Sequence, residues 1–232
     1  MGGIKNDFQI FKSFSELAHA KNLAEGNLYL RSVFYYRSHP ESNIRDFNEF
    51  TCRNGQGSSS LTNPALIFCC HDQLPASQPF LVKINSPYRL FNTIKRKLST
   101  AIYPKDNAYF GKVIYRQMRG DTPDVSPFPK VTFYCEKDPS TIDSIINCIY
   151  FKDTFFSEQN EARMCFLICP ERLSTLRDDD IEVKFCRRIH NKNLNRWEEE
   201  EINYDNWKNR DNYWFEVHLK VEESNFTLIK TQ

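Results

Sequence analysis

The sequence predicts an α+β fold of mainly antiparallel strands with a few short helices, formed by residues 1–232 as a single domain. Hydrophobic residues make up 40% of the chain and aromatic residues 14%, which is enough apolar surface for a sizeable core. Short segments in which apolar and polar residues alternate recur along the chain, as is typical of half-buried strands. No stretch rich in proline and glycine is long enough to divide the chain into two domains.

Each predicted element follows from a local pattern of residues. The first strand is expected at 7–14, and the leucine- and alanine-rich helix after it should end at Gly26, because glycine commonly follows a helix C-terminus. A second strand is expected over 27–37, where aromatic and other β-favouring residues dominate. Further strands are predicted at 65–70, 79–84, 109–118, 130–137, 162–169, 180–189, 213–221 and 225–229, and further helices at 88–100 and 141–151.

Charge and cysteine content narrow the classes of protein to consider. Lys+Arg 31 against Asp+Glu 30 give a formal net charge of +1, so only a local basic patch could bind nucleic acid. The eight cysteines form no CxxC pair and mostly lie in apolar surroundings, which predicts reduced thiols in a cytoplasmic protein. Neither a signal-type N-terminus nor a run of 18 apolar residues is present, so no membrane partner is expected.

The common signatures of nucleotide-binding and hydrolytic sites are missing. The sequence contains only 7 glycines and neither GxGxxG nor GxxxxGK[ST], which argues against a Rossmann or P-loop site. It also contains neither GxSxG nor HExxH. His71 follows Cys69 and Cys70, but neighbours on a strand point in alternate directions, so no metal site is expected there.

The stretch FFSEQNEARMCFLI, residues 155–168, is the strongest candidate for a catalytic site. Glu158 and Glu161 lie just before an apolar run that predicts a buried strand. Arg163 stands two residues after Glu161 and is expected on the same face of that strand, where its charge favours an ionised carboxylate. The alternative is an exposed, salt-bridged turn that leads into the core.

Two segments resemble a known family. The order of strand, helix closed by glycine, and strand LYLRS resembles the N-terminal half of ADP-ribosyltransferase-like folds. GNLYLRSVFYYR…IRDFNEF resembles small bacterial proteins in which a later E-x-E-x-R stretch opens a strand, and SEQNEARM is similar to that stretch. Phe50 stands where those proteins have a glycine, and the first strand carries Lys12 and Ser13 where a histidine is expected.

The resemblance implies NAD as a substrate and Glu161 as the catalytic carboxylate, with Glu158 nearer the acceptor. Breaking the bond between nicotinamide and ribose passes through an oxocarbenium-like state, which a fixed carboxylate stabilises. The same carboxylate can help to deprotonate the incoming nucleophile. The residues expected to contact NAD are Lys12, Arg31, Ser32, Tyr36, Arg37 and Arg163. No metal is expected.

Similarity to toxin components of anti-phage toxin–antitoxin systems implies an acceptor that is a nucleic acid, with RNA favoured, or a protein. It also implies a neutralising antitoxin protein as partner. Lys95, Arg96 and Lys97 on the predicted helix could contact phosphates, although a solvated helix face is the simpler interpretation.

Two other functions fit the same residues. The first is a non-enzymatic module that binds protein or nucleic acid, and the second is a metal-independent nuclease that uses basic residues and a histidine. The substitution Glu161→Gln is expected to separate enzyme from binding module. In an enzyme it should abolish activity and leave thermal stability nearly unchanged, whereas in a binding module it should change little, because surface substitutions usually alter stability by no more than about 0.5 kcal/mol.

Overall fold

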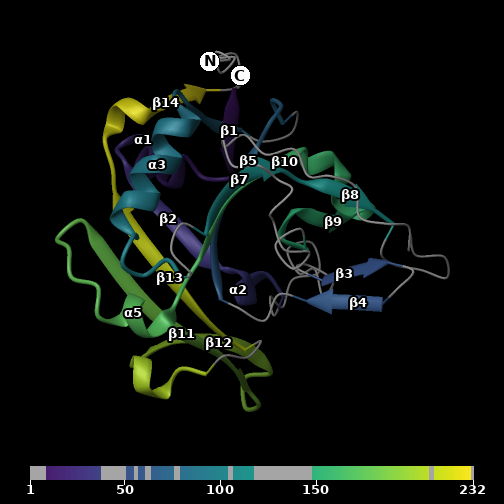
Figure 1. The fold of residues 1–232 in the computed structure, drawn as a ribbon, viewed down its shortest axis with the longest axis vertical. Helices are drawn as coiled ribbons and strands as arrows, with labels where there is room; N and C mark the ends of the chain where they lie inside the picture. Colours follow the sequence, from purple (N-terminus) through teal and green to yellow (C-terminus); the bar gives the residue numbers. More distant parts are fainter. Residues whose placement is uncertain are drawn as a thin grey trace.

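A ten-stranded sheet, forked at its centre, organises the chain (Figure 1). The computed structural model describes residues 9–37, 51–54, 57–60, 64–75, 79–103, 107–117, 148–208 and 212–230. The strands of the main sheet are β1 (Ile10–Phe14), β2 (Asn27–Ser32), β5 (Ala65–His71), β6 (Phe80–Ile84), β7 (Ala108–Lys112), β10 (Glu161–Leu167), β11 (Ile181–Asn191), β12 (Arg196–Ile202), β13 (Tyr213–Lys220) and β14 (Phe226–Lys230). Every pairing in this sheet is antiparallel, which confirms an α+β architecture of mainly antiparallel strands.

The fork arises because three strands pair with β5. One edge of β5 is paired along its whole length with β10, from Glu161 opposite His71 to Leu167 opposite Ala65. The other edge is shared, since β1 pairs with it only at His71 and β2 only at Leu66 and Ile67. Between these two contacts β1 diverges with β6 and β14, and β2 diverges with β13, β11 and β12.

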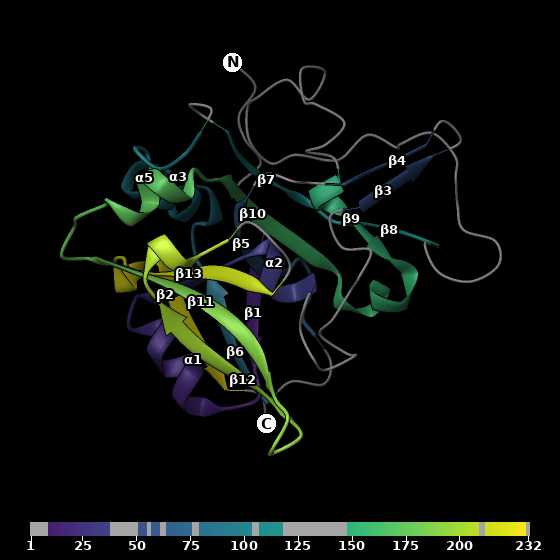
Figure 2. The same cartoon turned by 90° about the horizontal axis from the view of Figure 1, so that it is seen from below.

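Short helices cover both faces of the sheet and connect its strands. They are α1 (Leu17–Ala24), α2 (Val33–Arg37), α3 (Pro87–Lys97) and α5 (Pro170–Ser174), with the short 3-10 helices η2 (Cys148–Tyr150), η3 (Thr154–Gln159), η4 (Tyr204–Asn206) and η5 (Glu223–Asn225). The pairs β3 (Thr51–Asn54) with β4 (Gly57–Ser60), and β8 (Ile114–Arg116) with β9 (Phe151–Asp153), lie to one side of the main sheet in both views (Figure 2).

The larger core lies on the face under α1 and α3. It includes the fully buried Leu30 and Phe215 from the sheet, and Phe91 of α3 stacks on Phe110 and Phe166 at ring distances of 6.0 and 5.5 Å. A second, more aromatic core covers the opposite face and contains side chains of α2, η2 and the sheet. Alternation along β10 and β13 assigns successive side chains to these two cores, whereas β2 contributes Leu28 and Leu30 to the larger core only.

Gly26 connects α1 to β2, and its backbone conformation disfavours any other residue at this position. Its φ is +85°, in the left-handed region, and a Cβ added there would lie 2.1 Å from the carbonyl oxygen of Val221. The Val221 amide donates a 2.9 Å hydrogen bond to the Gly26 carbonyl. The predicted helix end is therefore confirmed, and its cause is a close approach of two backbones.

The structure corrects several predicted boundaries. The strand expected over 27–37 ends at Ser32, and its last five residues form α2. The strand expected over 109–118 is interrupted at Val113 between β7 and β8. The acidic tract WEEEE lies in β12 and was not predicted as a strand. The strand expected at 130–137, most of the helix expected at 141–151, and Phe50 lie outside the described residues.

Candidate functional site

A cavity of about 930 Å³ opens where β1 and β2 diverge from β5, and we call it the fork cavity. Lys12 and Phe14 line it from β1, and Tyr29 and Arg31 line it from β2. The base of the fork contributes Cys69 and its neighbours on β5, and α1 closes one end. Its volume lies in the upper part of the range of about 300–1,000 Å³ that is usual for small-molecule sites.

Arg31 is held rigidly in the wall of this cavity. Its Nε donates a 2.8 Å hydrogen bond to the Tyr29 hydroxyl and lies 3.2 Å from a carboxylate oxygen of Glu216. The guanidinium lies 3.9 Å from the ring centre of Tyr35 and 4.6 Å from that of Tyr29. Stacked between two aromatic rings, Arg31 presents a fixed cation to the cavity.

Glu216 stays ionised in this setting. Burial alone would raise the pKa of its carboxyl, but the neighbouring side chains of His218 and Tyr29 and the charge of Arg31 outweigh burial and lower the pKa to about 2. The sequence pattern did not single out this residue. What could have pointed to Glu216 in the sequence is that it is the one acidic residue in the mostly apolar segment YWFEVHL. Its position in the strand faces away from the larger core.

Acid should destabilise the fold through this carboxylate. Because the folded pKa of Glu216 is about 2, below the ordinary 4.5, its stabilisation is present above about pH 4.5 and is lost as the pH falls toward 2. We expect the urea midpoint to fall over this pH range. The fall should be smaller in Glu216→Gln, and an equally steep fall in that variant would contradict this assignment.

Three of the six residues predicted to contact NAD line the fork cavity: Lys12, Arg31 and Tyr36. Lys12 Nζ donates a 2.7 Å hydrogen bond to the Cys69 carbonyl and lies 5.4 Å from the ring centre of Phe68. The other three lie elsewhere. Ser32 is fully buried and its hydroxyl accepts from the Phe215 amide, Arg37 ends α2 away from the cavity lining, and Arg163 is buried beside Glu161.

Glu161 begins β10 and lies inside the protein, with only 4% of its surface exposed. The Arg163 guanidinium donates to both carboxylate oxygens, through Nε to Oε1 and through a second nitrogen at 3.2 Å to Oε2. Lys152 Nζ, on β9, donates to Oε2 at 3.0 Å. The prediction that Glu161 and Arg163 share a face is confirmed, but the turn is not exposed. We call Glu161, Arg163 and Lys152 the ion cluster.

The two cations decide the charge of this carboxylate. Burial alone would raise the pKa of Glu161, but the charges of Arg163 and Lys152 outweigh burial and hold the pKa far below its usual range. Glu161 is therefore ionised at neutral pH. Such a group can stabilise positive charge or accept hydrogen bonds, and it is poorly suited to donate a proton.

The 3-10 helix η3 connects β9 to β10 beside the ion cluster, and Lys152 Nζ donates to the side chain of its last residue, Gln159, at 2.8 Å. The Asp153 side chain accepts from the Phe155 amide and so starts η3, and Asn160 ends it with a left-handed φ of 42°. The Glu161 amide donates to the Tyr115 hydroxyl at 2.9 Å. Glu158 lies on η3 with an exposed side chain, so the two glutamates point into different environments.

One side chain connects the ion cluster to the fork cavity. Cys69 stands directly opposite Arg163 on the neighbouring strand, and its thiol helps to lower the pKa of the Glu161 carboxyl. Cys69 also lines the fork cavity. The carboxylate of Glu161 is thus separated from the cavity by a single layer of side chains.

His71 and Ser13 form a second polar pair beside the ion cluster. His71 lies directly opposite Glu161 across the β5–β10 pairing. Its Nε2 is 2.8 Å from the Ser13 hydroxyl, and its Nδ1 is 2.7 Å from the Gln159 carbonyl oxygen. Cys70 is buried in the larger core, on the opposite face. Among the described residues, no group of three side chains is arranged to hold a metal ion.

The three basic residues of α3 do not form one surface. Lys97 Nζ is 2.7 Å from the carboxylate of Asp180 and largely buried, whereas Arg96 is exposed. Successive positions on a helix are turned by about 100°, so three consecutive side chains spread around it. Contact of Lys95, Arg96 and Lys97 with nucleic acid stays a prediction.

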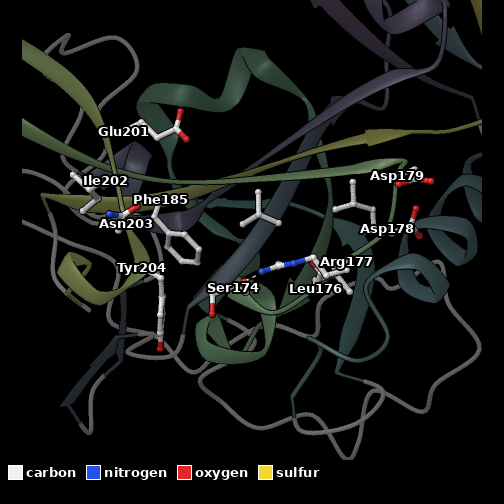
Figure 3. Close-up of a pocket in the computed structure, with 12 residues that line it drawn as sticks. Ser174, Leu176, Arg177, Asp178, Asp179, Phe185, Glu201, Ile202, Asn203 and Tyr204 are labelled. Carbon is white, nitrogen blue, oxygen red and sulfur yellow. Dashed lines mark hydrogen bonds between the residues drawn. The ribbon is translucent and has the colours of Figure 1, made fainter.

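A second cavity, of about 630 Å³, lies between the segment after α5 and the β11–β12 hairpin (Figure 3). Arg177 extends along it toward Ser174 and donates to the Ser174 carbonyl at 3.1 Å. Phe185 and Tyr204 form one end of the cavity, and Asp178 lies at the other end. None of the residues predicted from sequence to act in a site lines it.

Comparison of the chain with protein-family models, with curated proteins and with solved structures finds no match. Within the described part of the chain, no helix is both long and apolar enough to cross a membrane.

Proposed function

We propose that this protein is an NAD-dependent ADP-ribosyltransferase that binds NAD in the fork cavity. The observation that carries the proposal is that this cavity gathers Lys12, Arg31 and Tyr36, three residues that the sequence predicts to contact NAD. Lysine and arginine attract a diphosphate, and arginine can do so with two parallel hydrogen bonds. Tyr36 offers an aromatic face to a planar ring.

In this proposal Glu161 supplies the charge for catalysis. Its two cationic partners keep it ionised, which suits a step that develops positive charge on the ribose. Because Glu161 is 4% exposed, NAD must reach it past Cys69 or after a shift of η3. Glu158, exposed on η3, would then lie on the side from which an acceptor approaches.

The proposed acceptor is a nucleic acid, with RNA favoured over protein, and the proposed setting is anti-phage defence. Exposed Arg96 on α3 would contribute to phosphate contacts. A toxin of this kind requires a neutralising protein in the same cell, which is the partner we propose.

A binding experiment tests the cavity separately from catalysis. Removing the charge with Lys12→Met should weaken NAD binding about tenfold or more in titration calorimetry, because a charge-assisted hydrogen bond contributes about 1.5–3 kcal/mol. Lys21→Met, at an exposed position on α1, is the matched control and should bind NAD like the wild type. Equal binding by wild type and Lys12→Met would place NAD elsewhere.

Label transfer tests the activity. Protein incubated with labelled NAD and separate pools of RNA, single-stranded DNA and cell protein should label one pool, with RNA favoured. Glu161→Gln should abolish transfer at a temperature where circular dichroism shows that it is folded. No transfer and no NAD hydrolysis by folded wild type would refute the proposal.

A second candidate function is favoured by the ion cluster itself. A carboxylate whose two oxygens are both held by buried cations is also what a purely structural ion pair looks like. In that case the protein is a non-enzymatic binding module. Wild type and the Glu161→Gln variant would then bind the partner equally well whenever the fold is retained, and neither would consume NAD.

A further inference from the structure

Ser13 and His71 have the geometry of an activated hydroxyl and its base. The Ser13 hydroxyl on β1 lies 2.8 Å from His71 Nε2, within the range for a hydrogen bond. A nucleophile within reach of a base that a third group orients is the usual arrangement for activating a serine. Here the third group is the Gln159 carbonyl, 2.7 Å from Nδ1.

The hydrogen bonds define which nitrogen carries the proton. A carbonyl oxygen only accepts, so Nδ1 of His71 must carry the hydrogen that it donates to Gln159. In the neutral ring Nε2 is then the acceptor, and the Ser13 hydroxyl donates to it. Burial favours this neutral form, since it lowers the pKa of His71. The ring is therefore ready to take a proton from Ser13.

The pair lies at the junction of the two features that the proposed function uses. His71 is the direct cross-strand neighbour of Glu161, the proposed catalytic carboxylate. Ser13 lies on β1 between Lys12 and Phe14, which line the fork cavity, but its own side chain points to the other face of the strand, on the side of His71 and Glu161. The hydroxyl, the neutral base and the fixed anion thus share the face on which a ribose would have to meet Glu161.

We propose that Ser13 is the acceptor of an ADP-ribose unit that this protein transfers to itself, with His71 as the base. The inference rests on the proposed function. In the step, a bond forms between Ser13 Oγ and the ribose carbon that carries nicotinamide. The bond from that carbon to nicotinamide breaks, and its electron pair leaves with the neutral nicotinamide. The Ser13 proton passes to Nε2 of His71.

This reaction needs no oxyanion site, because positive rather than negative charge develops in the transition state. The nearby carboxylate of Glu161 favours that charge, and its two cations keep it ionised. The hydroxyl loses its proton as the new bond forms, so one neutral imidazole is a sufficient base. These residues therefore suit the transfer of ADP-ribose, through its ribose carbon, to a serine hydroxyl.

Peptide mapping by mass spectrometry after incubation of the purified protein with labelled NAD tests the inference. ADP-ribose should be found on Ser13 in wild type and in the control Ser15→Ala, an exposed serine just after β1. It should be absent at this position in Ser13→Ala and restored by Ser13→Thr, which returns a hydroxyl. His71→Gln should slow the modification by about 10²-fold or more, the usual share of a general base.

The outcomes separate this inference from the function on which it rests. Label on another residue, or unmodified Ser13 in wild type that transfers ADP-ribose to an external acceptor or hydrolyses NAD, overturns the inference alone. No consumption of NAD by folded wild type overturns both. An equal modification rate in His71→Gln and wild type overturns the role of His71.

Discussion

Replacing Glu161 with glutamine is expected to lower the free energy of unfolding by about 3–5 kcal/mol, because it leaves two buried cations without their anion. Arg163 is fully buried and the side chain of Lys152 is 9% exposed, so water cannot replace the lost carboxylate. Glutamine keeps the size of the side chain, but its amide group turns a donor toward cationic donors. Urea denaturation at neutral pH measures the loss.

Glu158→Gln provides the matched control. It makes the same chemical change three residues earlier, at an exposed side chain, and should stay within about 0.5 kcal/mol of wild type. Lys152→Met should cost less than Glu161→Gln, since Arg163 still pairs with the carboxylate. A Glu161→Gln variant as stable as Glu158→Gln would show that the ion cluster does not exist as described.

This expectation replaces the one drawn from sequence, in which Glu161→Gln left stability nearly unchanged. The earlier expectation assumed that Glu161 lies on the surface, and its 4% exposure contradicts that assumption. Loss of activity in this variant is therefore informative only at a temperature where the protein is folded. The substitutions at Lys12 and Ser13 do not remove a buried charge and test the same site more cleanly.

The strands that sequence analysis placed well are those with continuous apolar runs. β5 and β10 were predicted to within one residue at β5 and two at β10, because ALIFCC and ARMCFLIC are apolar on both faces. β12 was missed because its acids mask a strand. Glu199 and Glu200 stand directly opposite Arg188 and Arg187, so cross-strand ion pairs replace the usual apolar pattern.

Other errors came from contacts between distant residues. VFYYR has the composition of a strand, yet it forms α2, where Tyr35 packs on Arg31 and lies 5.5 Å from the Trp214 ring. The strand propensity of these residues is overridden by their packing against distant parts of the chain.

The site was predicted only in part for the same reason. The spacing of Glu161 and Arg163 was enough to place them on one face, because it depends on a single strand. Lys152 approaches from β9 through a reversal of the chain, and the fork depends on β1 and β2 sharing one edge of β5. Neither leaves a pattern in the local sequence.

Replacing Gly26 with alanine should be the other large destabilisation, and it should act on the fork as well. The left-handed backbone costs about 1–2 kcal/mol for alanine. The Cβ, only 2.1 Å from the Val221 carbonyl oxygen, must also displace that backbone, which adds about 1–3 kcal/mol. Thermal unfolding of Gly26→Ala against Glu25→Ala, an exposed neighbour expected to be neutral, measures the sum.

Asparagine separates the two costs. It adopts left-handed backbone more readily than alanine, but it brings the same Cβ toward Val221. Gly26→Asn should therefore remain clearly destabilised, and a near-neutral Gly26→Asn would mean that the close approach to Val221 is not real. Because Gly26 precedes β2, whose Tyr29 and Arg31 line the fork cavity, displacing this turn should also weaken ligand binding there. Binding lost in Gly26→Asn and retained in Glu25→Ala would tie the cavity to this backbone contact.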